Sequence, residues 1–408
     1  MTTRKKIIAL ALSVVLIIFA MATLIACTGQ DAGAPYNIII ANNDNMAVGA
    51  ANGLKELAKD IPIIGVDATD EAIEKIETGE IFGTVKQEIA GMADVILDIS
   101  ANFLKDKFVG TPETEEQPEI PANPNITITE SFQKTKWYND EQYHDTDLDL
   151  GDPDYNYTKK QNKVRMQYSE YDGTPEKEFD KKDLHGKKIK VFLMEAANAY
   201  LGRVQAAMVQ QSSLTENDFI PSLKQEQTEQ DNQIETELNK SDKPDLLLVN
   251  PVEPEQTENI VKKCKDAGVP VIFFNKENRT YDYSKNDTLY IGSGLDGGGI
   301  IQGEMVARML TDQNSPYKVE AGTTVRPVLL YGDPGHADAL FRTLTWIRSA
   351  NKLLEGKEIK IDFDLQINGN VNIKYMPSKE LNWSADGARA VIETLITSPG
   401  FKTLRKSA

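Results

Sequence analysis

The chain has 408 residues, with 45 Lys and Arg against 62 Asp and Glu, so its formal net charge is −17. This length allows two domains of ordinary size, and the negative charge argues against nucleic acid as a partner because it repels phosphate backbones. With only Cys27 and Cys264 present, neither a disulfide framework nor a cysteine metal cluster is expected.

The N-terminus has the pattern of an exported protein. A basic start, Arg4-Lys5-Lys6, precedes the apolar run Ile7–Ala22 and the tetrad Leu24-Ile25-Ala26-Cys27. This predicts a signal peptide over 1–26; the alternative, an uncleaved anchor, is disfavoured because a bilayer span needs ~20 apolar residues. Because the tetrad resembles a bacterial lipobox, we expect Cys27 to carry lipid and residues 27–35 to tether the protein to the extracytoplasmic face of the cell membrane.

Beyond the tether, short β-branched runs alternate with amphipathic helical segments, which predicts an α/β fold with parallel sheets. The expected strands are Asn37–Ala41, Pro62–Val66, Lys190–Met194, Asp245–Asn250, Pro270–Phe274, Leu289–Gly292 and Pro327–Tyr331. The expected helices include Met46–Lys59, Ala199–Gln211, Glu255–Ala267, Gly299–Thr311 and Ala385–Thr397. Cys264 falls inside a helical pattern and is interpreted as a packed thiol.

Polar residues follow several of these strands. Asp67, Asn250, Asn275 and Asp333 stand at or just after strand ends, where open α/β sheets place their ligands. Residues 105–160 are rich in Glu, Asp, Pro, Asn and Tyr, and are expected to be largely a loop insertion.

The segment Gly292-Ser293-Gly294-Leu295-Asp296-Gly297 fits the dinucleotide fingerprint G-x-G-x-x-G. A single glycine motif is weak evidence, and nucleotide cofactors are scarce outside the cell. We therefore interpret it as a crossing between two lobes, followed by a closely packed helix, and expect no cofactor.

Several segments together resemble the galactose/glucose-binding proteins of bacterial ABC transporters, which have the type 1 periplasmic-binding-protein fold. They are Val269–Glu277, Gly299–Glu304, Gly335–Ala339 with Arg342, Ile40–Ala47, Ile61–Ala68, Gly83–Val85 and Asn162–Tyr168. The resemblance implies two doubly wound parallel-sheet lobes joined by a hinge.

The family's two parts stand here in exchanged order, which a circular permutation explains; a truncated or fused tandem copy is the alternative. Lobe A would then comprise 87–161 and 187–293, and lobe B 36–86, 162–170 and 294–402. Residues 171–186 would link the ancestral chain ends. Exposed loops tolerate such rearrangement because few backbone hydrogen bonds are lost there.

By the same resemblance the chain supplies a complete set of sugar-binding side chains. The expected residues are Asn198, Tyr200 and Asn275 from one lobe, His336, Asp338, Arg342, Trp383, Asn43 and Asp67 from the other, and Gln87 near the hinge. Sugar hydroxyls need carboxylates and amides, and Tyr200 and Trp383 would sandwich the ring. Taken singly, each has an ordinary explanation: Asp338 and Arg342 as a solvated helix pair, Trp383 as core, and Asn42 or Asn45 as the cap of the next helix.

The chain also departs from the family. Asn198 replaces a common aspartate, Gln87 an asparagine and Tyr200 a phenylalanine, which leaves the sugar or epimer open. The family's calcium loop should fall at 312–327, where the alternating Asp and Asn ligands are absent, and Asn37 replaces the distant glutamate ligand. No structural metal is expected.

These features predict a monomeric solute-binding lipoprotein that captures a galactose- or glucose-like hexose for an ABC permease. A sugar-sensing module for a membrane receptor or kinase is the alternative. An enzyme is disfavoured, because neither a glycosidase carboxylate pair nor a nucleophile elbow is found.

Overall fold

The computed structural model describes residues 37–104, 157–158, 163–166, 168–174, 176, 178–283, 288–332, 337–361, 365–367, 371–373 and 383–397. The predicted signal peptide, Cys27, the tether, His336 and almost all of 105–160 lie outside these residues. Within the described ranges, no helix combines the length and apolar character that a bilayer span requires.

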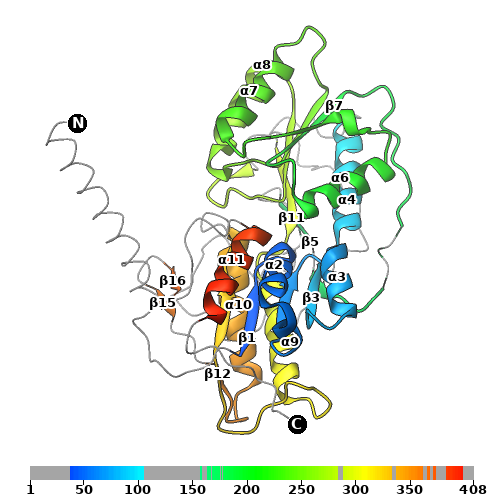
Figure 1. Cartoon of the computed structure of the whole chain (residues 1–408). Coiled ribbons are helices and arrows are strands. Elements are labelled where there is room, and N and C mark those ends of the chain that lie inside the picture. The colour runs from blue at the N-terminus through cyan, green and yellow to red at the C-terminus, as the bar shows by residue number, and fades with distance from the viewer. Residues whose placement is uncertain are drawn as a thin grey trace, which may run out of the picture.

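Two α/β lobes lie one above the other (Figure 1). Lobe A contains a seven-stranded sheet in the order β4 (Tyr157–Thr158), β5 (Lys163–Met166), β11 (Leu289–Ser293), β10 (Val271–Phe274), β9 (Leu246–Val249), β7 (Ile189–Leu193) and β8 (Phe219–Pro221). Lobe B contains a five-stranded sheet in the order β13 (Pro327–Leu330), β1 (Ile38–Ala41), β2 (Ile63–Val66), β3 (Gly83–Gln87) and β6 (Tyr168–Glu170). All strand pairs in the two sheets are parallel except β4 with β5 and β3 with β6.

Helices cover both faces of each sheet. In lobe A, α4 (Ile89–Phe103) and α6 (Ala199–Gln210) share one core, and α7 (Gln227–Leu238) and α8 (Thr257–Ala267) share the other. In lobe B, α9 (Gly297–Thr311) and α10 (Ala337–Leu353) lie on one face, with α2 (Asp44–Leu54) and α11 (Ala385–Ile396) on the other. The remaining short elements are η1 (Lys55–Lys59), α3 (Asp70–Glu77), η4 (Glu216–Asp218), η5 (Pro254–Gln256), β12 (Thr324–Val325), β14 (Lys360–Ile361), β15 (Leu365–Ile367) and β16 (Val371–Ile373).

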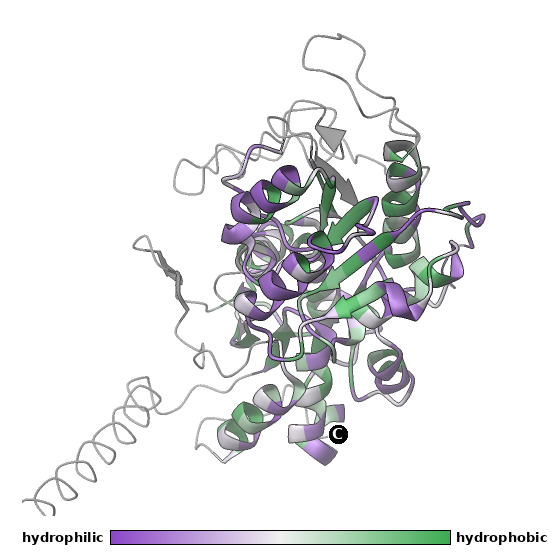
Figure 2. Cartoon of the chain, turned by 90° about the horizontal axis from the view of Figure 1, so that it is seen from above, coloured by the Kyte–Doolittle hydropathy of each residue, from purple (hydrophilic) through white to green (hydrophobic). Residues whose placement is uncertain are grey.

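The alternation of strand side chains explains this layering. Val191 and Leu193 of β7 point into the core with α4 and α6, whereas Phe192 between them packs with α7 and α8. Ile38 and Ile40 of β1 face α9 and α10, whereas Ile39 faces α2 and α11. Strands buried on both faces are continuously apolar, which produces the green strands among helices with purple outer faces in Figure 2.

The fold class and all seven named strands are confirmed, with strand ends shifted by at most one residue. Cys264 is buried in α8, and burial raises the pKa of its thiol to about 12, as expected for a packed thiol. One assignment is wrong: residues 162–170 do not all belong to lobe B. β5 pairs with β11 of lobe A, and only β6 pairs with β3 of lobe B, because the chain passes from one lobe to the other between these two strands.

The glycine motif lies at another crossing, where β11 ends and α9 begins. A Cβ added to Gly299 would lie 2.3 Å from the carbonyl oxygen of Arg342, and one added to Gly303 would lie 2.5 Å from that of Trp346. Both glycines therefore permit the close approach of α9 to α10, in agreement with the interpretation of this segment as a crossing and a closely packed helix.

Candidate functional site

A group of buried polar side chains lies at the carboxyl end of the lobe B sheet. We call it the inter-lobe cluster, and it comprises Asp67, Gln87, Tyr168, Asp338 and Arg342. Its members come from the end of β2, the end of β3, the start of β6 and the first turns of α10. Carboxyl ends of parallel strands are where α/β folds place ligands.

Arg342 lies at the centre of the cluster and is only 3% exposed to solvent. Nη2 donates to Asp338 Oδ2 at 2.9 Å and to the Tyr168 hydroxyl at 2.8 Å, and Nη1 donates to the backbone oxygen of Asn42 at 2.7 Å. The Asp338–Arg342 pair is thus buried, and the alternative of a solvated helix pair is wrong. Nε of Arg342 has no hydrogen-bond partner among the described residues.

Electrostatics keep Arg342 charged. Burial works to lower its pKa, but the neighbouring Tyr168, Asp338 and Asp67 more than offset this, so the pKa lies above its ordinary value. Burial also raises the pKa of the Tyr168 phenol well above its ordinary value, although Arg342 acts in the opposite direction. The guanidinium carbon lies 5.5 Å from the centre of the Tyr168 ring and 5.9 Å from that of Trp383.

Asp67 links the cluster to a hinge. Gln87 Nε2 donates to Asp67 Oδ1, and Gln87 Oε1 accepts from Ser293 Oγ at 2.8 Å. Gln87 stands where the chain leaves β3 for α4, and Ser293 where it leaves β11 for α9. The Asp67 carboxyl group is therefore connected through these hydrogen bonds to two of the segments that cross between the lobes.

Burial raises the pKa of Asp67 to about 7; the charge of Arg342 lowers it, and the nearby Asp44 raises it further. Burial likewise raises the pKa of Asp44 to about 6, against hydrogen bonds from Thr84 at 2.6 Å and from the Thr69 amide at 2.8 Å. Two carboxyl groups under the same strand ends thus titrate close to neutral pH.

Asn43 and Trp383 border the cluster. Asn43 Oδ1 accepts from the Met46 amide at 3.0 Å, so Asn43 itself caps α2, a role for which Asn42 and Asn45 were the alternatives. Its Nδ2 donates to the carbonyl oxygen of Trp383 at 3.4 Å. Trp383 is half-buried, and its backbone has a left-handed conformation with φ of 61°. Its indole lies over Gly332, where an added Cβ would be 2.4 Å from the ring.

Tyr200 lies in the core of lobe A, where its hydroxyl contacts Met92 Sδ at 3.7 Å. Burial raises its pKa well above the ordinary value, and so do Tyr168, Asp67 and Asp338 of lobe B. The sandwich of a sugar between Tyr200 and Trp383 stays a prediction.

Two other predicted residues make contacts within lobe A. Asn198 caps α6 by accepting from the Leu201 amide at 3.0 Å, and its Nδ2 donates to Glu195. Asn275 follows β10 with φ of 64°, and its carbonyl oxygen accepts from the Tyr290 hydroxyl at 2.7 Å. The structure therefore brings together Asp67, Gln87, Asp338 and Arg342, with Asn43 and Trp383 beside them. The contacts of Tyr200, Asn198 and Asn275 lie within lobe A.

The site contains residues that the sequence analysis did not assign. Tyr168 appears there only as the last residue of the segment Asn162–Tyr168, and neither Asp44 nor Arg203 was given a role. Asp44 follows Asn43 at a helix start, where acidic residues are common, so its burial had no distinctive signal. Arg203 is one of many helix cations, and only the fold shows that it reaches lobe B. Among the described residues, no group of three or more His, Cys, Asp and Glu side chains is placed to hold a metal ion.

Comparison with known proteins gives relatives of one kind. The D-galactose/methyl-galactoside binding periplasmic protein MglB of Haemophilus influenzae is 32% identical over 138 residues, which are 33% of this chain and 41% of that protein. The ribose import binding protein RbsB of the same organism is 35% identical over 60 residues, which are 14% of this chain and 20% of that protein. The chain thus covers less than half the length of either relative.

Solved structures give weaker likenesses. The arabinose-binding component of an ABC transporter from Shewanella sp. ANA-3 has a TM-score of 0.32 and 17% identity, covering 42% of this chain and 52% of that one. A solute-binding protein from Bacillus halodurans with bound myo-inositol has a TM-score of 0.30 and 24% identity, covering 43% and 55%.

The family profile described as a periplasmic binding protein domain matches residues 20–108 and 189–403, well over half of the chain. The relatives reported above are named as binding proteins, in agreement with the expectation that this chain is not an enzyme. The resemblance identified from the sequence is thereby confirmed at the level of the family: the chain belongs to the periplasmic binding protein domain family.

Proposed function

We propose that this chain is an extracytoplasmic solute-binding lipoprotein that captures a monosaccharide between its lobes and delivers it to an ABC importer. Family membership supports binding, and the names of the galactose- and ribose-binding relatives support a sugar as the ligand. The resemblance to galactose/glucose-binding proteins makes a galactose- or glucose-like hexose the first candidate, and the departures at Asn198, Tyr200 and Gln87 leave the exact sugar or epimer open.

The observation that carries this proposal is the buried Arg342, with two nitrogens bonded to protein and Nε without a partner among the described residues. A buried donor without a partner costs about 1–3 kcal/mol, so a ligand oxygen at this position would be favourable. Sugar hydroxyls both donate and accept, and the carboxyl groups of Asp67 and Asp338 beside Arg342 supply the matching acceptors.

Lobe closure is the mechanism that fits this arrangement. The hydrogen bonds from Ser293 to Gln87 and from Gln87 to Asp67 connect two crossing segments to a candidate ligand-binding carboxyl group. Rotation at these crossings would move Tyr200 of lobe A relative to Arg342 of lobe B. Such hinge closure buries the ligand and creates a surface that a permease can distinguish from the open form.

The membrane anchor is part of the proposal and rests on the sequence of residues 1–35 alone. Cys27 would carry the lipid, and residues 27–35 would hold the lobes near the importer. A monomer with one ligand site suffices for this role.

The exchanged chain order is also proposed, and it is supported by the neighbouring positions of β1 and β13 in one sheet and by the packing of α11 against α2. Segments from both ends of the sequence thus complete one lobe. A chain cut again to start at residue 187, with residue 400 joined to residue 37, should fold and bind as the original does; failure to fold would contradict the permutation.

Calorimetric titration of the protein from residue 28 onward with galactose, glucose, ribose and xylose tests the function. We expect binding at micromolar concentration or below, about −8 kcal/mol or better, for at least one sugar. No heat with any of them would contradict the monosaccharide assignment. Analysis of each sugar after prolonged incubation is the companion measurement, since any product would show catalysis.

A further inference from the structure

Arg203 of α6 joins the two lobes directly. Its Nη1 donates to the backbone oxygens of Asp67 at 3.0 Å and Ala68 at 2.6 Å, which follow β2 in lobe B. The Arg203 side chain is 25% exposed, so these charge-assisted bonds are largely shielded from water. Arg203 therefore binds the backbone of Asp67, and the carboxyl group of Asp67 belongs to the inter-lobe cluster.

The backbone of Asp67 and Ala68, to which Arg203 donates, has an unusual conformation. Asp67 has φ of 119° and Ala68 has φ of 51°, values that residues with a Cβ rarely adopt. The Asp67 amide donates to Val85 at 2.7 Å, and the Ala68 amide donates to Thr84 Oγ1 at 3.3 Å. The turn thus leaves two successive carbonyl oxygens for a donor from lobe A, while the Asp67 carboxyl group meets Gln87.

Glu176 holds Arg203 in place from the chain segment that connects the lobes. Its Oε1 accepts from Arg203 Nη2 at 2.7 Å. The segment begins in lobe B, where the Tyr171 amide donates to Thr84 at 3.0 Å, and it reaches lobe A, where Lys182 pairs with Asp94 of α4 at 2.9 Å. Glu176 lies between these two attachments and orients the guanidinium toward lobe B.

A second arginine bridges the lobes from different strand ends. The guanidinium carbon of Arg279, which follows β10 in lobe A, lies 4.8 Å from the ring centre of Phe341 in α10 of lobe B. Arg203 follows β7 and reaches the end of β2, so the two bridges do not share a strand in either lobe. Phe341 directly precedes Arg342, so this contact also adjoins the inter-lobe cluster.

We propose that Arg203, oriented by Glu176, is a latch between the lobes that stabilises the closed state and slows release of the bound ligand. The proposal rests on the proposed sugar capture, but the latch uses protein atoms only and therefore also acts without ligand. Arg203 is a positioning residue, because it holds the turn that contains Asp67. Its hydrogen bonds to the backbone oxygens of Asp67 and Ala68 form only when the two lobes are close together. Its loss should increase the dissociation rate and leave the order of preference among sugars unchanged.

The variant Arg203→Ala tests this in the protein from residue 28 onward, with Arg308→Ala as the matched control. Arg308 also forms an arginine–glutamate pair, with Glu170, but both residues lie in lobe B. Small-angle X-ray scattering of the ligand-free proteins should give a larger radius of gyration for Arg203→Ala than for wild type and Arg308→Ala. Equal radii for all three would overturn the latch, whatever the ligand is.

Stopped-flow dissociation of the sugar that gives heat with wild type provides the second readout. Losing the two charge-assisted hydrogen bonds from Arg203 to lobe B should speed dissociation of the sugar by at least about tenfold in Arg203→Ala, whereas the association rate should change far less. Glu176→Gln should fall between wild type and Arg203→Ala, because it keeps the hydrogen bond and loses the charge. Unchanged dissociation in Arg203→Ala would overturn the latch. Wild type that binds no sugar would contradict the proposed function, and the scattering comparison would still decide the latch.

Discussion

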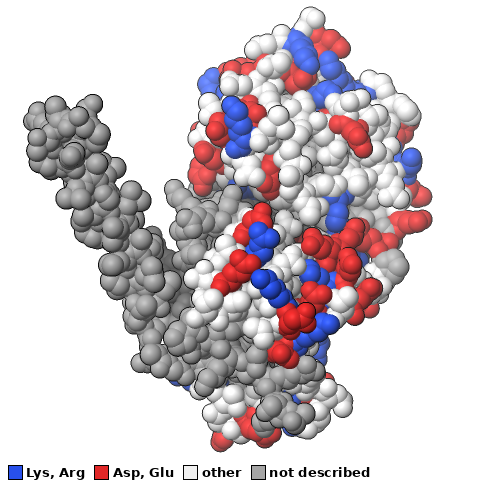
Figure 3. All heavy atoms as spheres, in the orientation of Figure 1, with Lys and Arg blue, Asp and Glu red and all other residues white. Residues whose placement is uncertain are grey.

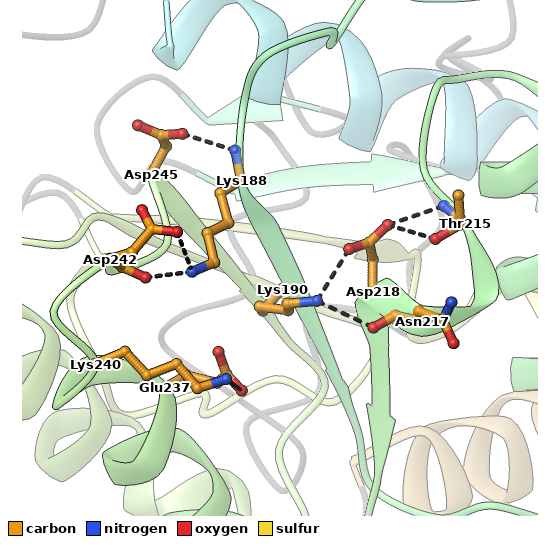
Figure 4. Close-up of polar contacts among 9 residues, drawn as sticks. All are labelled: Lys188, Lys190, Thr215, Asn217, Asp218, Glu237, Lys240, Asp242 and Asp245. Carbon is orange, nitrogen blue, oxygen red and sulfur yellow. Dashed lines mark hydrogen bonds and ion pairs between the residues drawn. The ribbon is translucent and has the colours of Figure 1, made fainter.

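Charged and polar side chains form one network at the amino ends of lobe A strands and another at the carboxyl ends of lobe B strands, and the two networks differ in burial. At the amino ends of β7 and β9 lies what we call the amino-end network, which comprises Lys188, Lys190, Thr215, Asp218, Asp242 and Asp245 (Figure 4). Figure 3 shows that Lys and Arg side chains and Asp and Glu side chains are interspersed over the face of the molecule that it presents. The inter-lobe cluster lies at the carboxyl ends and is buried.

The difference in burial decides what each network can do. The side chains of Lys188 and Asp242 are 30% and 89% exposed, whereas those of Arg342 and Asp338 are 4% and 10% exposed. Exposed pairs contribute about 0–1 kcal/mol because water and salt screen them. Buried pairs cost desolvation, so they persist where all partners are present and respond strongly when one is removed. The same residue types are therefore screened by water in the amino-end network and shielded from it in the inter-lobe cluster.

The largest effect is expected from Arg342→Ala, which leaves Asp338 and the Tyr168 hydroxyl buried without their cation. The free energy of unfolding in urea should fall by about 3–5 kcal/mol, and sugar affinity should fall by at least about 100-fold. Arg342→Lys keeps the charge but lacks the planar guanidinium group, so its stability and sugar affinity should lie between those of wild type and Arg342→Ala. Stability within about 0.5 kcal/mol of wild type would contradict the buried cluster.

A smaller effect concerns pH. Because the pKa of Asp67 is about 7 in the folded protein and near the ordinary 3.8 in the unfolded chain, the folded state binds the proton more tightly. This stabilisation is complete below about pH 4 and is lost as the pH rises through 7. The free energy of unfolding should therefore fall between pH 5 and pH 8, on the order of 2–4 kcal/mol.

Asp67→Asn is the test of that assignment, because the amide cannot titrate. Urea unfolding at pH 5 and pH 8 should show a clearly smaller difference than in wild type, with the remainder owed in part to Asp44. An equal pH dependence in both proteins would mean that Asp67 is not the titrating group.

Tyr168→Phe should have an intermediate effect. It removes only the hydroxyl that accepts a hydrogen bond from the charged Arg342. The free energy of unfolding should therefore fall by about 1.5–3 kcal/mol. Sugar affinity measured by calorimetry should fall less than in Arg342→Ala. A variant with wild-type stability and affinity would show that Tyr168 does not hold Arg342 in position.

The smallest effect is expected in the amino-end network. Lys188→Ala removes bonds to the backbone oxygen and to Oδ2 of Asp242, the second 3.0 Å long. Because the side chains of Lys188 and Asp242 are 30% and 89% exposed, the free energy of unfolding should change by less than about 1 kcal/mol, and sugar affinity should stay as in wild type. A loss comparable with that of Arg342→Ala would abolish the distinction between the two networks.

The sequence predicted much of the framework because local patterns determine it. Buried strands such as β1 and β9 are runs of β-branched and aliphatic residues, and their helices show a regular apolar stripe. The division between lobes was less predictable: β5 and β6 are separated by one residue, and no local pattern tells which sheet each joins.

The site was predicted in part, and mostly through the resemblance. Asp67, Gln87, Asp338 and Arg342 were all expected, and they meet. Tyr168 was missed because its partner Arg342 is 174 positions away, and Arg203 because its contact with Asp67 spans 136 positions. Helix cations and strand tyrosines are common, so only the packing of the lobes gives these two a role. His336 and Cys27 stay predictions because they lie outside the described residues.

A crystal structure of the protein grown with the sugar that gives the largest heat tests the central claim most directly. We predict that the sugar lies between the lobes, with a hydroxyl within hydrogen-bond distance of Arg342 Nε and another at the carboxyl group of Asp67. A sugar bound elsewhere, with Arg342 Nε still without a partner, would contradict the assignment of the inter-lobe cluster as the binding site.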